Sequence, residues 1–323
     1  MEFLSHRINV DLSLIIVNHN TRGLLKQLLL SIKRNTKKVF YEIIVVDNAS
    51  GDRSAALVKE DFQDIVLIEN QSNLGFSQAN NQAVKIAKGD YLLFLNSDTI
   101  VCENAVESLF SFLEQEKYAA VVGCKLLNID DTLQRSCGIF PNLKTEFYFR
   151  TFLNRLFPTS PTFGSFKLGS WDYSSLMEVD WVSGACLMIR KNIFDQIGGF
   201  DETLYMYYED ADLCLRVKKL GWKIYFIPDA YVYHLHGGSW QQNREIPIIN
   251  GCKSALYFFR KHHDLWKVPL LKILILIETL LSYLILTPIL VIKGEKYAII
   301  KSRFRGYTAC LKYLLSDSFG KSG

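Results

Sequence analysis

The chain lacks the cysteine pattern of a disulfide-stabilised secreted protein. Its seven cysteines form no CxxC pair and follow no regular spacing, which fits a reducing compartment better than a disulfide framework. An export signal is also missing, because residues 1–11 are polar and mixed in charge rather than apolar. These two absences predict a protein that is made and kept in the cytoplasm.

No glycine-rich phosphate loop occurs early in the chain, which argues against a nucleotidyltransferase built on an α/β sheet. Internal repeats and low-complexity tracts are absent as well. What remains is an ordinary globular composition, with 49% hydrophobic and 22% charged residues among 323. This length and composition predict one large α/β domain with an appendage.

Positive charge is concentrated towards the carboxyl end. Residues 253–323 hold 12 Lys and Arg against 4 Asp and Glu, a net charge of +8. Since the whole chain carries +4, residues 1–252 carry −4. The acidic main part argues against a nucleic-acid partner, and the basic tail favours an anionic surface such as phospholipid.

The first part of the chain repeats a pattern of apolar run, polar loop and helix. Apolar or β-branched runs occupy residues 12–17, 41–46, 65–68 and 91–95, and Asn or Asp follows each of them. Such repeats predict a parallel sheet whose polar residues collect along one edge. With a further helix and a strand at 119–127, residues 1–127 are expected to form a nucleotide-sugar half.

The regular pattern fades over residues 128–178, where scattered prolines and glycines predict a long irregular excursion over the site. Strands are expected again at 179–189, interrupted near residue 184, and at 223–227, with a further apolar run at 230–236. A helix is expected at 213–220. Residues 128–250 would form an acceptor and catalytic half, so that a single domain covers 1–250.

Residues 251–323 are expected to form a basic, hydrophobic membrane-association segment. Within it, residues 268–292 contain only Lys272 and Glu278 as charges and are long enough to span a bilayer. Basic residues flank this stretch on both sides, and Pro288 and Glu278 weaken a straight span. A monotopic or re-entrant arrangement with both ends cytoplasmic is favoured; a true span and a helix buried against protein are the alternatives.

Asp98 follows the fourth predicted strand, at the sheet edge where open α/β folds bind ligands. Its carboxylate could hold a metal or only cap the helix that begins near Glu103. Asn96 stands where a second acid would strengthen the site, so a hard cation, Mg²⁺ or Mn²⁺, would take further oxygens from a diphosphate and water. His234 or His236 could be a second ligand, although a histidine in an apolar strand is more often a core residue.

Polar residues at the other strand ends are candidates for nucleotide binding. Asp47 could accept the imide N–H of a pyrimidine, and the loop at 18–20 could pack on the ring. The alternative is that Asp47 and Asp52 only cap helices. The NLGF sequence at 73–76 could likewise be only a turn, in which Gly75 adopts an unusual φ.

The densest acidic cluster is EDAD at 209–212, directly after aromatic residues. Acids at a helix N-terminus favour the helix dipole, and Asp212 is expected to play that structural part. Carboxylates beside Tyr207 and Tyr208 are partly desolvated, which raises their pKa towards that of a useful general base. Glu209 and Asp210 are therefore the candidates for catalysis.

Taken in order, these motifs resemble glycosyltransferase family 2, the inverting GT-A enzymes, and within it the rhamnosyltransferase-like members that build bacterial surface polysaccharides. The resemblance covers about residues 12–240. It is carried by IVNHN at 16–20, VVDNAS at 45–50, NLGF at 73–76 with ANN at 79–81, LNSD at 95–98, VDWVSGA at 179–185, GGFDE at 198–202, YEDAD at 208–212 and HLHGGS at 234–239.

The resemblance implies an α/β fold of GT-A type, a Rossmann-like and mostly parallel sheet flanked by helices, followed by the membrane-associated helical segment. It implies a divalent cation as cofactor and Asp210 as the catalytic base. The implied roles of the other residues are metal binding by Asp98 and His234, nucleotide-sugar binding by Val17, Asn18, His19, Asn20, Asp47, Asn73, Gly75 and Asn96, and acceptor binding by Trp181, Ser183, Gly184 and Glu209.

The implied activity moves a sugar from a nucleotide donor to a hydroxyl of a lipid-linked saccharide, at the cytoplasmic face of the bacterial inner membrane. Segments at 135–141 and 169–172 resemble the subgroup that favours dTDP-sugars, so dTDP-rhamnose is the expected donor. His19 and Asn96 depart from the usual Tyr and first acid of the family. The alternatives are another donor, such as UDP-galactofuranose or a UDP-hexose, and an inactive membrane-bound scaffold.

Overall fold

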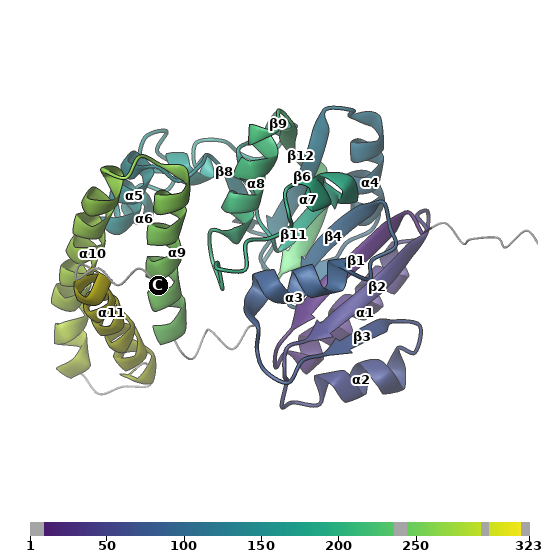
Figure 1. The fold of residues 1–323 in the computed structure, drawn as a ribbon, viewed down its shortest axis with the longest axis horizontal. Coiled ribbons are helices and arrows are strands. Elements are labelled where there is room, and N and C mark those ends of the chain that lie inside the picture. The colour runs from purple at the N-terminus through teal and green to yellow at the C-terminus, as the bar shows by residue number, and fades with distance from the viewer. Residues whose placement is uncertain (1–9, 236–243, 292–296, 318–323) are drawn as a thin grey trace, which may run out of the picture.

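The computed structural model describes residues 10–235, 244–291 and 297–317. Its centre is a mixed sheet with the strand order β3-β2-β1-β4-β11-β6-β12-β5 (Figure 1). These strands are β1 (Leu12–Asn18), β2 (Tyr41–Asp47), β3 (Val66–Glu69), β4 (Tyr91–Asn96), β5 (Thr99–Val101), β6 (Ala119–Leu127), β11 (Cys186–Arg190) and β12 (Lys223–His234).

Strands β1 to β4 are parallel, as their apolar runs predicted. The expectation of a mostly parallel sheet is confirmed, and within this strand order there are two exceptions. Strand β11 runs antiparallel to both of its neighbours, and β5 runs antiparallel to β12. Because β1, β2 and β4 share one direction, their carboxyl ends meet at one edge of the sheet.

Side chains alternate between the two faces of the sheet, and helices cover both. Ile15 and Phe94 belong to one core cluster, whereas Ile16 and Leu93 belong to the other, which is the period of two that a strand imposes. The Ile16 face packs against α1 (Arg22–Asn35), α2 (Ser54–Asp61) and α4 (Ala105–Gln115), and the Ile15 face against α3 (Gly75–Val84), α7 (Lys191–Gln196) and α8 (Glu209–Lys219).

The region predicted to be irregular contains short regular elements. Asn142 begins helix α5 through a capping box, because its side chain accepts from Thr145 N while the Thr145 hydroxyl accepts from Asn142 N. The elements here are β7 (Leu133–Gln134), β8 (Cys137–Gly138), α5 (Leu143–Arg150), α6 (Leu153–Leu156), η1 (Ser165–Lys167) and β9 (Met177–Glu178).

Two strand predictions need correction in detail. The stretch at 179–189 forms two strands that do not share a sheet, because β10 (Trp181–Val182) pairs with β8 while β11 enters the main sheet. The runs at 223–227 and 230–236 form one strand, β12, through His234. Its register with β6 shifts between Ile227 and Tyr231.

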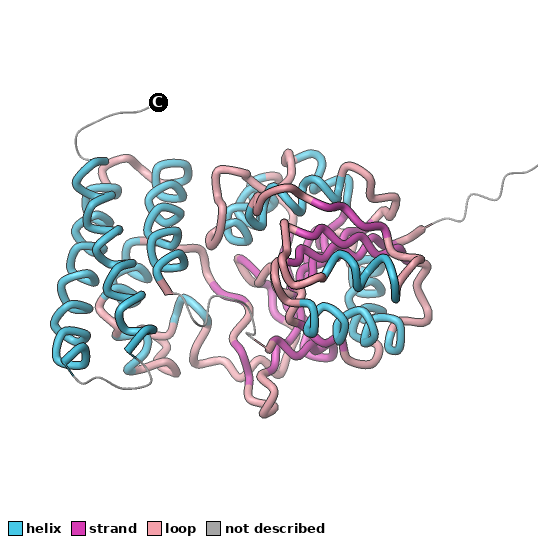
Figure 2. Tube along the Cα trace, turned by 90° about the horizontal axis from the view of Figure 1, so that it is seen from below, coloured by secondary structure: helices cyan, strands magenta, loops and turns pink. Residues whose placement is uncertain are grey.

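The carboxyl-terminal helices form a layer beside the sheet together with α5 (Figures 1 and 2). They are α9 (Glu245–His262), α10 (Lys267–Val291) and α11 (Tyr297–Asp317). Leu271 of α10 and Leu314 of α11 belong to the same core cluster as Phe94 of the sheet. The tail is therefore packed onto the α/β part through continuous apolar contacts.

Helix α10 has two different apolar faces. In the described part of the chain, Lys267–Pro288 is the one helix long and apolar enough to span a membrane, with a mean hydropathy of 2.1 and a third of that stretch buried. Leu271 and Ile275 lie inside the protein, and Glu278 pairs there with Arg150 at 2.7 Å. Leu284 on the other side is 72% exposed.

Candidate functional site

The carboxyl ends of three parallel strands bring most of the predicted nucleotide-binding residues to one edge. Asn18 is the register partner of Asp47, and Val17 is the partner of Asn96. Asn18 and Asp47 are buried, whereas Val17 and Asn96 are partly exposed. The sequence pattern thus located this edge correctly, because parallel strands place their ends together.

Asn18 and Asp47 are held by each other. Asn18 Nδ2 donates to Asp47 Oδ2 at 3.0 Å and to Ser50 Oγ at 3.1 Å. Asp47 Oδ1 accepts from Ser50 N at 2.8 Å. Both carboxylate oxygens of Asp47 therefore already have a donor within the chain, and its role in reading a base stays a prediction.

The loop at 18–20 is cross-linked to the loop that follows β2. His19 Nδ1 lies 2.8 Å from Asn48 O, and Asn20 Oδ1 accepts from Gly51 N at 2.7 Å. Asn20 and Ala49 have left-handed φ angles of 56° and 62°. Non-glycine residues seldom adopt this conformation, and functional sites are where such strain concentrates.

The third strand-end loop, at 73–76, contacts both the loop that follows β2 and the segment before α8. Asn48 Nδ2 donates to Gly75 O at 3.1 Å, and Asn73 Oδ1 accepts from Gly75 N at 2.9 Å. Gly75 has φ 80°, and a Cβ there would lie 2.5 Å from the Tyr205 ring. Both the left-handed backbone and the close contact require glycine. The loop is thus a turn into α3 that also contacts Tyr205, in the segment before α8.

Asp98 and His234 are brought together by the antiparallel pairing of β5 with β12. His234 Nε2 lies 3.3 Å from Asp98 Oδ1 and 3.4 Å from Asn96 Nδ2. Leu235 N also donates to Asp98 O at 2.9 Å, which fixes the two segments to each other. His236 and the glycine pair after it lie outside the described residues.

Gln134 determines which nitrogen of His234 carries the proton. Its Nε2 donates to His234 O at 2.6 Å and to Asn128 Oδ1 at 2.6 Å, so its Oε1 is the atom that faces His234 Nδ1 at 3.0 Å. In the neutral ring Nδ1 then carries the hydrogen, and the Nε2 lone pair is directed to the side of Asp98. Sequence reasoning missed Gln134, because nothing in its neighbourhood marks it.

This donor set fits a hard divalent cation. Neighbouring ligands of an octahedral ion with bonds of about 2.1 Å lie about 3 Å apart, close to the spacing of Asp98 Oδ1 and His234 Nε2. Across residues 10–235, 244–291 and 297–317, no three His, Cys, Asp or Glu side chains converge on one point. Two protein ligands suit an ion that takes its other oxygens from a diphosphate and water.

The acidic pair begins helix α8 in a partly buried position. Asp210 Oδ1 accepts from Ala211 N at 2.7 Å, and Oδ2 accepts from Gly184 N at 3.4 Å. Burial raises the pKa of Asp210. Burial and the neighbouring Asp210 charge raise the pKa of Glu209 to about 8, and Glu209 Oε2 has no hydrogen-bond partner among the described residues.

A short path of contacts joins the acidic pair to the metal-binding candidates. Asn96 N, two residues before Asp98, donates to Ala185 O at 3.1 Å. Ala185 adjoins Gly184, whose N–H contacts Asp210. The turn at 183–185 therefore connects the carboxyl edge of the parallel strands with the candidate base, which the sequence pattern did not reveal.

Of the predicted acceptor residues, Trp181 differs in position from the others. It is 6% exposed, its indole N–H donates to Ile139 O at 2.8 Å, and its ring packs on Phe166. It supports the turn that carries Ser183 and Gly184. Ser183 is partly exposed, so it and Glu209 offer the polar atoms of this part of the site.

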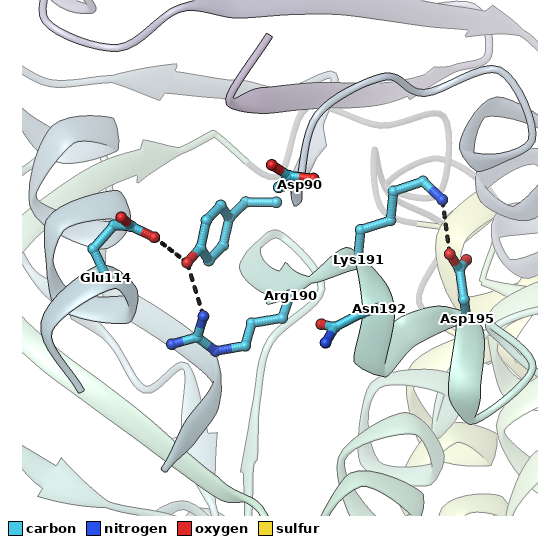
Figure 3. Close-up of a pocket in the computed structure, with 7 residues that line it drawn as sticks. Asp90, Glu114, Arg190, Lys191, Asn192 and Asp195 are labelled. Atoms are coloured by element: carbon cyan, nitrogen blue, oxygen red, sulfur yellow. Dashed lines mark hydrogen bonds and ion pairs between the residues drawn. The ribbon is translucent and has the colours of Figure 1, made fainter. Parts of the chain in front are cut away.

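A hollow of about 480 Å³ lies at the opposite end of β4 (Figure 3). Arg190 crosses it, donating to Tyr91 Oη at 2.8 Å and to Ala119 O at 2.8 Å, and Tyr91 in turn donates to Glu114. These donors are used by the protein itself. The Arg190 and Tyr91 side chains at this hollow are hydrogen-bonded within the protein, and none of the residues that line it belongs to the predicted site.

The chain is similar in sequence to two bacterial proteins that are named as rhamnosyltransferases. An N-acetylglucosaminyl-diphospho-decaprenol L-rhamnosyltransferase of Mycobacterium tuberculosis is 25% identical over 80% of this chain and 87% of its own length. Rhamnosyltransferase WbbL of Escherichia coli K12 is 29% identical over 68% of this chain and 82% of its own.

Two solved structures share the fold. GalNAc-T7 with UDP, GalNAc and Mn²⁺ superposes with a TM-score of 0.53 at 16% identity, covering 71% of this chain and 44% of that one. TarS of S. aureus gives 0.50 at 18% identity, covering 82% and 42%. The chain spans less than half the length of these two proteins. Residues 13–173, about half of the chain, match Glycosyl transferase family 2, and the chain belongs to this family, with its GT-A fold.

Proposed function

We propose that the protein is an inverting glycosyltransferase that moves rhamnose from dTDP-rhamnose to a hydroxyl of a lipid-linked saccharide in the synthesis of a bacterial surface glycan. Both relatives are named as rhamnosyltransferases, which supports the sugar, and the decaprenol diphosphate in the name of the mycobacterial relative supports the lipid-linked acceptor. The observation that carries the proposal is the contact path from Asn96 through the 183–185 turn to Asp210. It supports the proposal because it links a carboxylate with a raised pKa to the donor edge, the carboxyl ends of β1, β2 and β4 at which we expect the nucleotide sugar to bind.

Asp210 acts as the general base. It takes the proton from the acceptor hydroxyl while that oxygen attacks the anomeric carbon from the side opposite the diphosphate. The new C–O bond forms as the bond to the diphosphate oxygen breaks, and the leaving group keeps the electron pair. One displacement inverts the anomeric centre. The Gly184 N–H donates to Asp210 Oδ2 at 3.4 Å and so restricts the rotation of the carboxylate.

Glu209 has a different role because its pKa is about 8. At neutral pH it is protonated, so it can donate a hydrogen bond to the acceptor without adding a second negative charge next to Asp210. Asp98 and His234 would hold the divalent cation, and Asn18, His19, Asn20, Asp47, Asn73 and Gly75 would surround the nucleotide. When bound, the cation neutralises charge on the leaving diphosphate.

The donor is tested by incubating purified full-length protein with dTDP-rhamnose and a panel of UDP-sugars, and measuring nucleotide release with a prenyl-diphosphate-linked acceptor. We expect turnover with dTDP-rhamnose and a product whose anomeric configuration is inverted by NMR. Turnover only with a UDP-sugar would overturn the rhamnosyl assignment. A folded protein inactive with all donors would favour the inactive scaffold.

We further propose a monotopic attachment to the cytoplasmic face of the membrane through the outer face of α10. Ile273, Leu280 and Leu284 are 53%, 52% and 72% exposed, and Trp266 before the helix is 62% exposed. Their spacing gives one apolar stripe, whereas the opposite face of α10 packs on protein. A helix with one protein-facing and one exposed apolar face suits the membrane interface better than a span.

Vesicle sedimentation tests this attachment. Leu280→Glu with Leu284→Glu should lower binding to anionic vesicles at least about tenfold, because two charges enter the apolar stripe. The matched control is Phe40→Glu, since Phe40 is 71% exposed far from the tail in sequence. Equal binding of both variants would contradict the α10 surface.

A further inference from the structure

The segment at 206–212, which carries the proposed base, has a strained backbone that needs support. Tyr207 and Tyr208 have consecutive left-handed φ angles of 65° and 66° directly before helix α8. Bulky side chains disfavour this conformation, so it persists only where surrounding contacts hold it. Those contacts come from α5 and from the carboxyl-terminal helices.

Tyr208 is the first point of support. Its hydroxyl donates to Glu146 of α5 at 2.5 Å, and its ring packs against Phe258 of α9. Burial and the Glu146 charge raise the pKa of Tyr208 well above its ordinary value, so the hydroxyl stays a donor. Glu146 thus receives a fixed hydrogen bond from the residue that precedes the acidic pair.

Glu146 belongs to a buried triad that reaches α10. Arg150 Nε donates to Glu146 Oε2 at 2.9 Å, and Arg150 Nη1 donates to Glu278 Oε2 at 2.7 Å. All three side chains are at most 8% exposed. A second tyrosine, Tyr307 of α11, contacts the other oxygen of Glu278 at 3.4 Å. The triad therefore connects the 206–212 segment with α5, α10 and α11.

Helix α9 contacts both ends of the 206–212 segment. Ser254 Oγ donates to Met206 O at 2.7 Å. At the other end, Lys261 Nζ and His262 Nε2 each lie 2.6 Å from Asp212 Oδ1, and Asp212 is fully buried. Asp212, expected to be a simple helix-dipole residue, is thus an attachment point for α9.

Stability alone does not account for the triad. Replacing a buried ion-pair triad by apolar residues of similar volume is often neutral or stabilising, because the desolvation of charges offsets their attraction. Charged groups do fix directions, since a guanidinium holds two carboxylates in set positions. The orientation of Tyr208 is what this triad fixes.

We propose that Arg150, Glu146 and Glu278 form a positioning triad for the transfer reaction, acting through Tyr208 on the direction of Glu209 and Asp210. The inference rests on the proposed function of Asp210. It gives Glu278 of α10 a positioning role in the reaction, in addition to the membrane attachment proposed for the outer face of that helix. None of the three residues contacts the donor edge; each acts through Tyr208.

The sharpest test is Tyr208→Phe, which removes one hydroxyl and leaves the ring. We expect kcat to fall about tenfold with the donor KM unchanged, because misdirection of the base affects the chemical step. Tyr283→Phe is the matched control: its hydroxyl joins α10 to Thr308 of α11, away from the segment. Equal kcat for Tyr208→Phe and wild type would overturn the proposal.

A double-mutant cycle separates positioning from stability. The variant Glu146→Leu, Arg150→Met, Glu278→Leu should keep its thermal unfolding temperature within a few degrees yet lose as much kcat as Tyr208→Phe. Adding Tyr208→Phe to it should then have no further effect. Wild-type kcat in a stable triple variant would overturn the proposal. If the triple variant does not fold, the kcat of Tyr208→Phe alone tests the proposal: a reduced kcat supports it, and a wild-type kcat overturns it.

Hydrogen exchange distinguishes failure of this inference from failure of the proposed function. Tyr208→Phe should speed amide exchange across 206–212, and Tyr283→Phe should not, whatever reaction the protein catalyses. Faster exchange in an enzyme whose wild type transfers no sugar would uphold the support of this segment and reject the proposed function. Unchanged exchange with unchanged kcat would reject the triad alone.

Discussion

The two ends of strand β4 carry polar clusters that are built in opposite ways. At the amino end, the Arg190 guanidinium donates to backbone carbonyls and to Tyr91, so its donors are used within the protein. At the carboxyl end, Asp98 and His234 bring two potential ligand atoms within 3.3 Å. The donors of the amino-end cluster are bound by acceptors within the protein. The two atoms of the carboxyl-end cluster have the spacing that a cation requires.

The volume of a hollow therefore does not identify a functional site in this protein. At the amino-end hollow, Arg190 donates to Ala119 O and to Tyr91, and Lys191 pairs with Asp195 (Figure 3). The carboxyl edge combines ligand spacing with a carboxylate, Asp210, whose pKa is raised by burial. Chemistry of this kind marks function better than shape does.

The largest effect is expected from Asp210→Asn. A neutral amide cannot take the acceptor proton, so kcat should fall by about 10² to 10⁴ while donor binding by calorimetry stays unchanged. Asp90→Asn is the matched control at the amino-end hollow and should keep wild-type kcat. Near-normal turnover of Asp210→Asn would refute its role as base.

Metal removal should have the next largest effect. EDTA should abolish transfer and Mn²⁺ should restore it, and Asp98→Asn should need at least about tenfold more Mn²⁺ for half-maximal rate. Gln134→Leu should weaken Mn²⁺ binding about tenfold by calorimetry, because His234 loses the partner that orients its ring. Activity that persists in EDTA would contradict a metal-dependent site.

The pH dependence should report Asp210. Because the pKa of Asp210 is raised, its carboxyl group keeps the proton at pH values above the ordinary carboxyl pKa of about 4. The ionised form that acts as the base is therefore populated only at a higher pH. We therefore expect kcat/KM to rise with pH along a limb above the usual carboxylate range. Glu209→Gln should keep this limb, since burial is the main cause of the Asp210 shift. A profile flat down to about pH 4 would contradict it.

Changes at the amino end should affect stability and leave catalysis intact. Arg190→Met should lower the free energy of unfolding by about 2 kcal/mol, because several hydrogen bonds from a charged group are lost. The kcat per folded molecule should equal that of wild type. Denaturant titration and the nucleotide-release assay measure the two quantities, and a selective loss of kcat would assign this end a function.

The smallest effect is expected for Lys191→Ala at the same hollow. Lys191 pairs with Asp195 at 2.7 Å on the surface of α7. Exposed pairs four residues apart contribute about 0.3 to 0.5 kcal/mol, so unfolding should shift by no more than this. A change above about 1 kcal/mol would show that the amino-end network is more tightly coupled than its contacts indicate.

The sequence allowed the strands and the common edge of their carboxyl ends to be predicted, because buried strands need apolar runs and parallel strands end together. Strand direction was harder to predict, because β11 runs antiparallel to β4 and β6 and hydrophobic periodicity does not encode direction. Helix α5 was missed because it is short and mixes Glu146 and Arg150 with aromatics. Only the fold places Glu278 beside Arg150, 128 residues earlier in the chain.

Asp98 and Asp210 could be proposed from the sequence because each combines a suitable residue type with a suitable position, and their roles stay predictions. Contacts that depend on packing were not accessible. Trp181 looked like an acceptor contact, yet its ring is enclosed beside Phe166, and its direct role stays a prediction. Gln134 contacts His234 and Tyr208 contacts Glu146, and no local sequence pattern marks residues of this kind.

Hydrogen exchange with bound nucleotide would show directly which end of β4 is the donor site. The full-length protein is measured with and without dTDP and Mg²⁺, and in parallel with UDP and Mg²⁺. We predict slower amide exchange at residues 18–20, 47–51, 73–76 and 96–98 with at least one nucleotide, and no change at 90–91 or 190–195. Protection at the amino end, or at neither end with both nucleotides, would contradict a donor site at the carboxyl edge.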